Sequence, residues 1–242
     1  MDLKISGSGV IGGGTYEEVK ISGSAKIEGS VNCESFAVSG AVRGEGHIEA
    51  AGDVKVSGSL KLDGGVKAKE VHVSGSVKCC DLAGSEEVHL SGGAEIGGRL
   101  SGGDVHVSGG IRVDEGIEAE DFRLSGSMDC KGLINAENVE ISLYKSCSTA
   151  QAIGGASVVV RVGAGSGRSV LSALFSNRPA SAGTLTVKET IEADDVELVN
   201  THCPLVTGAR VRIGRGCKIG KVCYSEEVGI DPDAEVGETV KI

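Results

Sequence analysis

Apolar and polar residues alternate along most of the chain, and the alternating segments recur at a nearly constant interval. The repeat is marked by a serine that returns after 16, 17 and 18 residues and then five times after 17 residues. Each of these serines except the last is followed by glycine. The serines are Ser6, Ser22, Ser39, Ser57, Ser74, Ser91, Ser108, Ser125 and Ser142. A fixed period of this kind indicates a repeat architecture before any local propensity is considered.

Three short alternating segments make up each repeat. The first precedes the Ser-Gly pair and has two apolar residues separated by one polar residue, as in Val54–Val56 and Val105–Val107. The second follows the pair, as at Leu60–Leu62, and the third begins at positions such as Val66 and continues to a small residue such as Ala68. Alternation with a period of two predicts β-strands. Glycines at the corners are expected to supply positive φ.

The repeat predicts an all-β fold, a single-stranded parallel β-helix with about 17 residues in each coil of three strands. Right-handed crossovers are strongly preferred in parallel sheets, so a right-handed β-helix is expected. Regular coils are expected at residues 1–145 and 185–242, on the same solenoid axis. Residues 146–184 break the period and are expected to form an irregular insert, with an extruded loop at Gly163–Gly183 and one helical turn at Val170–Phe175.

Composition favours a narrow, repetitive core. The 242 residues include 39 Gly, 3 Phe, 3 Tyr and no Trp, yet 40% are hydrophobic. Val, Ile, Leu and Ala therefore have to fill the core, and the apolar fraction is too high for a disordered Gly/Ser-rich chain. Eight cysteines without paired zinc-site spacing are expected to be reduced thiols. Cys79, Cys130 and Cys147 fall in one column and are expected to be buried, with Cys80 exposed.

The sequence predicts a cytoplasmic protein. No apolar run approaches the roughly 18 residues of a membrane span. The N-terminal residues lack the basic leader and apolar region of a signal peptide. A net charge of −10 argues against general binding to nucleic acid. No transmembrane segment is expected, and peripheral membrane association is left open.

The first and last coils are candidate surfaces for self-association. Both have the strand pattern, and an open sheet edge is a template for pairing with another chain. The alternative is that bulges or charges such as Glu235 and Glu238 cap the last coil. The candidate polymerisation residues are Leu3, Ile5, Val236, Val240 and Ile242.

Several units share a family pattern. Val-x-Val/Ile-Ser-Gly-Ser/Gly units occupy residues 19–24, 54–59, 71–76 and 105–110, and related segments occupy 186–198 and 209–219. In these features the chain resembles the bactofilins, bacterial polymer-forming cytoskeletal proteins, over most of its length outside roughly residues 145–183. The resemblance implies a right-handed β-helix that polymerises end to end without nucleotide. It also implies filaments, cytosolic or adjacent to the membrane, that position other proteins in cell shape or motility.

Some bactofilins carry a short apolar N-terminal membrane anchor, and many have flexible tails. Here the first coil begins at Leu3 and the sequence stops at Ile242. Direct membrane attachment through such an anchor is therefore not expected.

Three histidines, His72, His89 and His106, occupy one outward column on successive coils. Adjacent imidazoles about 4.8 Å apart suit Zn, Ni or Cu, but the outer two are about 10 Å apart and cannot share one ion. The same column also holds Lys55 and Arg123. We therefore expect a solvated polar ladder whose charge responds to pH, rather than a metal site.

A second outward column is basic and lies beside an acidic one. Opposite charges so close together favour simple solvation of a flat face. The alternative is a ridge for an acidic partner or an anionic lipid. The basic column comprises Lys26, Arg43, Lys61, Lys78 and Arg112, interrupted by Glu95 and Asp129, and the acidic one comprises Glu28, Glu45, Asp63 and Asp114.

No catalytic, cofactor-binding or metal-binding set is predicted. The glycines at 163–167 resemble a phosphate loop but lack its lysine and its βαβ context. A hexapeptide-repeat acyltransferase is the enzymatic alternative. It is disfavoured by the 17-residue period and by a 163–183 loop without histidine, which leaves His202 as the nearest candidate. A non-polymerising β-helix adaptor is the other alternative. The sequence favours a non-enzymatic scaffold whose partners are copies of itself and client proteins.

Overall fold

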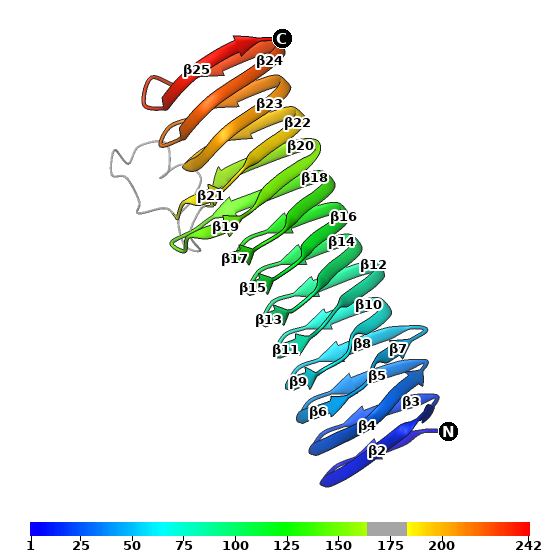
Figure 1. Ribbon diagram of the computed structural model, residues 1–242. Helices are drawn as coiled ribbons and strands as arrows, with labels where there is room; N and C mark the ends of the chain where they lie inside the picture. The colour runs from blue at the N-terminus through cyan, green and yellow to red at the C-terminus, as the bar shows by residue number, and fades with distance from the viewer. Residues whose placement is uncertain (164–182) are drawn as a thin grey trace, which may run out of the picture. The chain divides into compact units, whose positions relative to one another are not determined.

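The computed structural model describes residues 1–163 and 183–242. Every regular element in these residues is a β-strand, and parallel strands form a solenoid of about 13 turns with a repeat of roughly 17 residues (Figure 1). The predicted parallel β-helix is therefore confirmed, while its right-handedness stays a prediction. The chain divides into two compact units, Met1–Asp121 and Phe122–Ile242.

The N-terminal unit is built from short strands. They are β1 (Leu3–Ile5), β2 (Ser8–Thr15), β3 (Glu18–Ile21), β4 (Ser24–Cys33), β5 (Ser35–Val38), β6 (Ala41–Glu45), β7 (Ile48–Ala50), β8 (Asp53–Val56), β9 (Ser59–Leu62), β10 (Val66–Val73), β11 (Ser76–Cys79), β12 (Leu82–Leu90), β13 (Gly93–Ile96), β14 (Arg99–Val107) and β15 (Gly110–Val113).

The C-terminal unit contains the two longest strands of the described residues, Thr201–Ile213 and Lys218–Ile230. Strand β16 (Gly116–Leu124) contains the boundary between the units. It is followed by β17 (Ser127–Cys130), β18 (Leu133–Leu143), β19 (Ser148–Ala150), β20 (Ala152–Val162), β21 (Leu185–Val187), β22 (Thr190–Leu198), β23 (Thr201–Ile213), β24 (Lys218–Ile230) and β25 (Glu235–Lys241).

Each coil has the three sides that the sequence pattern predicts. Strands β7, β8 and β9 form the sides of one coil as separate elements. In the next coil the third and first sides join into the single strand β10, whose pairing with β12 shifts register between Ala68 and Glu70. A register shift of this kind bends a strand without ending it. In many coils the third side and the first side that follows it therefore form one continuous strand instead of the two that were predicted.

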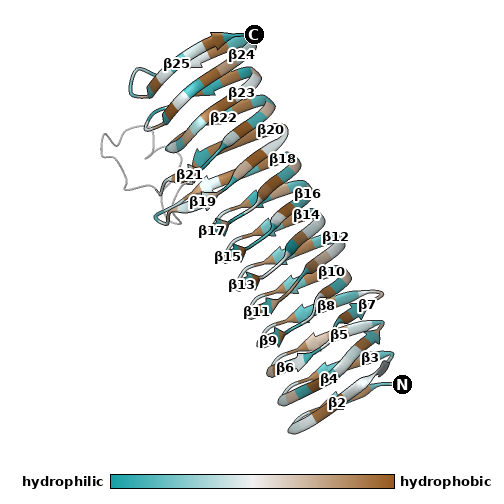
Figure 2. Ribbon diagram, viewed as in Figure 1, coloured by the Kyte–Doolittle hydropathy of each residue, from teal (hydrophilic) through white to brown (hydrophobic). Residues whose placement is uncertain are grey.

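Inward residues stack in columns from coil to coil. Val54, Val71, Val88 and Val105 are successive register partners, and each is fully buried. Figure 2 shows hydrophobic and hydrophilic residues alternating along the strands. Burying one such side chain contributes roughly 1.5–3 kcal/mol. Because each column is buried only by the coils on either side, stability depends on contacts between neighbours.

The glycine of the Ser-Gly corner is required for a different reason from the one expected. A Cβ added to Gly75 would lie 1.9 Å from the carbonyl oxygen of Gly58 on the preceding coil. Positive φ is found at the glycine column before the third side, with φ of 106° at Gly29 and 101° at Gly46. The Ser-Gly corners thus need glycine because backbones of successive coils approach closely, and the expectation of positive φ is wrong there.

In the C-terminal unit, regular strand pairing continues into residues that were expected to be irregular. Strands β19 and β20 lie within residues 146–184, the range expected to be irregular. The period changes there because Asp129 pairs with Thr149, which makes this coil 20 residues long. The lengthening moves Cys147 out of the inward column, so this cysteine is exposed and its expected burial is wrong. Ala150 is buried in its place.

Residues 164–182 lie outside the described part of the chain. The expected extruded loop, the helical turn at 170–175 and most of the glycine-rich 163–167 segment fall there. The alternation expected beyond this segment is present in β21 to β25.

Candidate functional site

The N-terminal coil presents an open sheet edge. Strand β1 pairs with β3, and β2 pairs with β4, so the other edge of each has no strand partner in the described residues. Leu3 and Ile5 are in register with buried Val19 and Ile21 and are themselves only half-buried. On β2, Val10 is 63% exposed, but it is in register with Lys26 on the outward face, and the inward Ile11 is buried. The inward columns therefore reach an incompletely covered surface along β1.

The C-terminal coil has a similar edge. Strand β25 pairs with β24, and no strand of the described chain covers its other side. Val236 is half-buried in register with buried Ile219, so it continues an inward column. Farther along β25, Thr239 is in register with fully buried Val222. Because register partners on neighbouring parallel strands face the same side of the sheet, Thr239, itself exposed, continues the inward column there.

Two of the expected C-terminal residues lie differently from Val236. Val240 is half-buried and in register with Cys223, on the face opposite to that of Thr239. Ile242 is 67% exposed and follows the end of β25, where its amide donates to the carbonyl of Tyr224 at 2.9 Å. The pattern of apolar residues alone indicated Val240 as a candidate polymerisation residue. The register instead places Thr239 in the inward column of the last coil.

Two acidic residues of the last coil form ion pairs with lysines of the preceding coil. Glu235 Oε1 lies 3.1 Å from Lys218 Nζ, and Glu238 Oε2 lies 3.1 Å from Lys221 Nζ. These ion pairs are exposed and contribute little stability. They place the carboxylates over β24, so the sequence alternative in which they cap the outer edge of β25 gains no support from their position.

The three histidines form the expected ladder, and this name is kept below for His72, His89 and His106. They are successive register partners on β10, β12 and β14, and all three are half-buried. The ring centroids of His72 and His89 are 6.3 Å apart, and those of His89 and His106 are 5.0 Å apart. The spacing along the ladder is therefore uneven.

A column of carboxylates runs beside the His ladder. Asp53, Glu70, Glu87 and Asp104 are successive register partners, each two residues before Lys55 or a ladder histidine on the same face. Hydrogen bonding to the Lys55 ammonium lowers the pKa of Asp53. Glu70 Oε2 lies 3.4 Å from His72 Nε2. In the described residues no group of three or more His, Cys, Asp or Glu side chains is already arranged to hold a metal ion.

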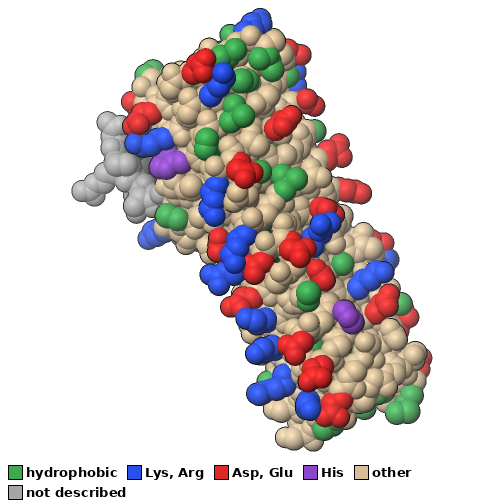
Figure 3. Space-filling model, viewed as in Figure 1, with side chains coloured by type: hydrophobic (Ala, Val, Ile, Leu, Met, Phe, Trp, Pro, Cys, Tyr) green, Lys and Arg blue, Asp and Glu red, His purple; other side chains and the backbone are tan. Residues whose placement is uncertain are grey.

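The basic column follows the second side of the coils. Lys26, Arg43, Lys61 and Lys78 are successive register partners. Figure 3 shows Lys and Arg side chains following this face, with Asp and Glu side chains next to them. Lys26 Nζ lies 2.7 Å from Glu28 Oε1, and Lys78 is paired with Glu95. This mixture of charges is the arrangement expected of a solvated face.

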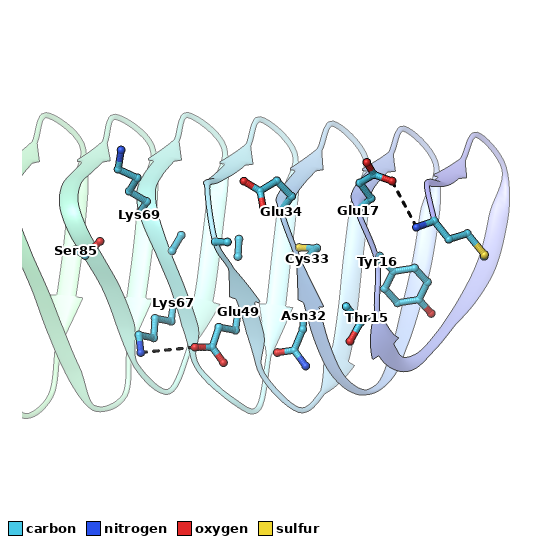
Figure 4. Close-up of a pocket in the computed structure, with 14 residues that line it drawn as sticks. Thr15, Tyr16, Glu17, Asn32, Cys33, Glu34, Glu49, Lys67, Lys69 and Ser85 are labelled. Atoms are coloured by element: carbon cyan, nitrogen blue, oxygen red, sulfur yellow. Dashed lines mark ion pairs between the residues drawn. The ribbon is translucent and has the colours of Figure 1, made fainter.

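A shallow groove of about 790 Å³ runs beside the small-residue column of the N-terminal unit (Figure 4). Buried Ala50 and Ala68 form part of its lining. Lys67 Nζ lies 3.6 Å from Glu49 Oε1 at its side. The groove thus offers small residues and charges that pair with each other, rather than polar groups converging on one point as in a ligand site.

Two curated proteins resemble parts of the chain. It is 30% identical to the uncharacterized protein YhbF of Bacillus subtilis (strain 168) over 104 residues, which are 43% of this chain and 39% of YhbF. It is 40% identical to the uncharacterized protein YhbE of the same organism over 48 residues, 20% of each chain. The alignments therefore span well under half of these relatives. No family model matches the chain, and no solved structure matches it.

The cysteines divide into buried and exposed thiols. Cys79 and Cys130 are buried and Cys80 is exposed, as expected. Burial raises the pKa of Cys79 to about 12, so this thiol remains protonated and unreactive near neutral pH. The neighbouring Asp81 carboxylate raises the pKa of Cys80, which disfavours its reactive thiolate.

Sequence reasoning found the His ladder and missed the carboxylates beside it. The signal was present, because acid-Val-His occurs at 70–72, 87–89 and 104–106. His202, the residue raised by the acyltransferase alternative, lies between Thr186 and Lys218 in its register column. Its immediate strand neighbours therefore provide no carboxylate to orient the ring. No helix of the described chain is long and apolar enough to cross a membrane.

Proposed function

We propose that this protein is a structural scaffold that self-assembles end to end into nucleotide-independent cytoskeletal filaments and positions other proteins. The proposed site of action is the cytoplasm, with roles in cell shape or motility. The resemblance to bactofilins supports the same assignment. The proposal treats the protein as non-enzymatic, with copies of itself as its main partner.

The observation that carries the proposal is the open edge on both terminal coils. Strands β1, β2 and β25 each have one side without a strand partner among the described residues. Unpaired N–H and C=O groups on such an edge are completed when a strand of another chain adds to it. The half-buried Leu3, Ile5 and Val236 would become covered by the same contact. Backbone pairing and apolar burial thus favour the same association.

Two edge variants test the proposal. The N-edge variant carries Leu3→Lys and Ile5→Lys, and the C-edge variant carries Val236→Lys and Thr239→Lys. Inward-pointing charges on an edge strand oppose pairing. The matched control, Asn135→Lys plus Asn138→Lys, adds the same charges at exposed positions of the internal strand β18. Circular dichroism checks that all variants remain folded.

The measurement is negative-stain electron microscopy without added nucleotide or metal. We expect long filaments from the wild type and from the Asn135/Asn138 control, and none from either edge variant or from a protein carrying both. Filaments that persist when both edges are blocked would contradict the proposal. Discrete wild-type trimers would support the acyltransferase alternative, and stable wild-type monomers would support the adaptor.

A further inference from the structure

The His ladder contains one pair of rings that is closer than the other. His89 and His106 are direct register partners on β12 and β14, with ring centroids 5.0 Å apart and ring planes inclined by 55°. His72 and His89 occupy equivalent positions on β10 and β12, but their centroids are 6.3 Å apart. The spacing of about 4.8 Å between neighbouring strands accounts for the shorter distance, so it is the His72–His89 distance that departs from the repeat.

The spacing of the closer pair matches that of two imidazoles on one metal ion. An imidazole nitrogen binds Zn²⁺ at about 2.0–2.1 Å, which puts the ring centroid roughly 3.2 Å from the ion. Two rings separated by the ~109° angle of a tetrahedral site then have centroids about 5.2 Å apart. The 5.0 Å between His89 and His106 is close to this value, whereas 6.3 Å between His72 and His89 is too long.

We propose that His89 and His106 form a surface site for a divalent transition-metal ion, of which Zn²⁺ is the representative. Imidazole is a preferred ligand of Zn, Ni and Cu. The protein supplies two imidazoles, and water completes the coordination. The described residues contain no group of three or more His, Cys, Asp or Glu side chains arranged to hold a metal ion, so the proposed site has two protein ligands only.

The carboxylate column contributes favourable charge to this site. Glu87 and Asp104 precede His89 and His106 by two residues on the same face of β12 and β14. Their negative charges attract a divalent cation at short range. The buried Val88 and Val105 between each acid and its histidine fix the two strands in register. The imidazoles are therefore held on a rigid sheet rather than on a loop.

A bound ion would connect two successive coils of the N-terminal unit. β12 and β14 belong to neighbouring coils, and the ion links their side chains across the sheet surface. Anything that binds the folded state in preference to the unfolded chain raises apparent stability. Zn²⁺ is therefore expected to raise the melting temperature of the protein when both histidines are present.

The test is calorimetric titration of ZnCl₂ into the full-length protein. Cys80 and Cys147 are exposed, and cysteine thiolate is itself a common zinc ligand that would compete with imidazole. All measurements therefore use a Cys80→Ser/Cys147→Ser background. In this background we compare His72→Gln, His89→Gln, His106→Gln and the control His202→Gln.

We expect His89→Gln and His106→Gln each to weaken zinc binding at least about tenfold, since even outer-shell partners of a bound metal usually contribute that much. His72→Gln and His202→Gln should leave the affinity within about threefold of the background protein, because neither ring belongs to the proposed pair. The zinc-induced rise in melting temperature should disappear with His89→Gln and His106→Gln only.

Two results would overturn the proposal. The first is equal zinc affinity in the background protein and in His89→Gln. The second is a loss in His72→Gln as large as that in His106→Gln, because the ladder would then bind without preference for the closer pair. Filament formation plays no part in these measurements, so the outcome is separate from the fate of the scaffold proposal.

Discussion

At the scale of single residues, the repeat is shaped by close contact between backbones. From Gly23 to Gly109, the Ser-Gly corners stack so tightly that a Cβ on the glycine would collide with a carbonyl oxygen of the previous coil. A Cβ at Gly92 would lie 1.8 Å from the oxygen of Gly75, far inside contact distance. The adjacent Gly93 is different, since a Cβ there would have nothing within 4 Å. Gly93 therefore has room for the methyl group of alanine, whereas the adjacent Gly92 does not.

This contrast gives a matched pair of substitutions. We expect Gly92→Ala to reduce the free energy of unfolding by roughly 1–3 kcal/mol, the usual cost of forcing extra atoms into a packed interior. Gly93→Ala should be neutral or stabilise by about 0.4–1 kcal/mol, because alanine restricts the unfolded chain. Urea denaturation followed by circular dichroism measures both. Equal effects of the two substitutions would show that the corner can relax around a methyl group.

At the scale of strands and coils, the sequence was sufficient to predict the strands and the buried columns wherever the 17-residue period was maintained. Alternating Val, Ile and Leu predicted the strands and buried columns, because coils that repeat every 17 residues place equivalent residues in register. Prediction failed at Cys147, where the coil lengthens to pair Asp129 with Thr149. Val240 stays a candidate for the self-association surface, although the register places Thr239 rather than Val240 in the inward column of β25. In both places pairing register, rather than residue type, determines which face a side chain occupies.

The candidate site, too, was predictable from the sequence only in part. The column of His72, His89 and His106 followed directly from the period. The uneven spacing of the rings did not, because it depends on side-chain conformations that a repeat pattern does not specify. The open edges of the terminal strands were expected from the pattern, but which side chains lie inward at the last coil required the observed register.

Two side-chain hydroxyl groups, those of Ser148 and Thr149, form hydrogen bonds across the lengthened coil between β17 and β19. Strand pairing there consists of Asp129 with Thr149. The fully buried Ser148 accepts a hydrogen bond on its Oγ from the Met128 amide at 3.2 Å. A side-chain oxygen thus provides an acceptor beside a very short strand pairing.

We expect Ser148→Ala to lower the free energy of unfolding by about 1–3 kcal/mol, because a buried amide donor loses its acceptor. The control is Ser146→Ala, a serine two residues earlier whose side chain is exposed. Chemical denaturation of both variants gives the comparison. A Ser148→Ala protein as stable as Ser146→Ala would mean that the Met128 amide finds another partner.

At the scale of the whole molecule, the proposed assembly raises the question of which edges join. Joining the N-terminal edge of one copy to the C-terminal edge of another would continue parallel pairing. Joining like edges would pair the terminal strands antiparallel through a two-fold, self-complementary contact. Antiparallel pairing is slightly more stable per residue, and two-fold contacts are the commonest in homo-oligomers. We therefore expect like edges to join.

Blocking one edge at a time distinguishes these arrangements. If like edges join, the N-edge variant and the C-edge variant should each form dimers through the edge that remains open, and mixing them should produce nothing new. If unlike edges join, each variant should be monomeric alone, and mixing should create heterodimers. Analytical ultracentrifugation of the separate and mixed proteins measures this, with the protein blocked at both edges as the monomer standard. Monomeric single-edge variants that dimerise only on mixing would contradict our expectation, because open N-terminal and C-terminal edges would then be complementary to each other rather than to themselves.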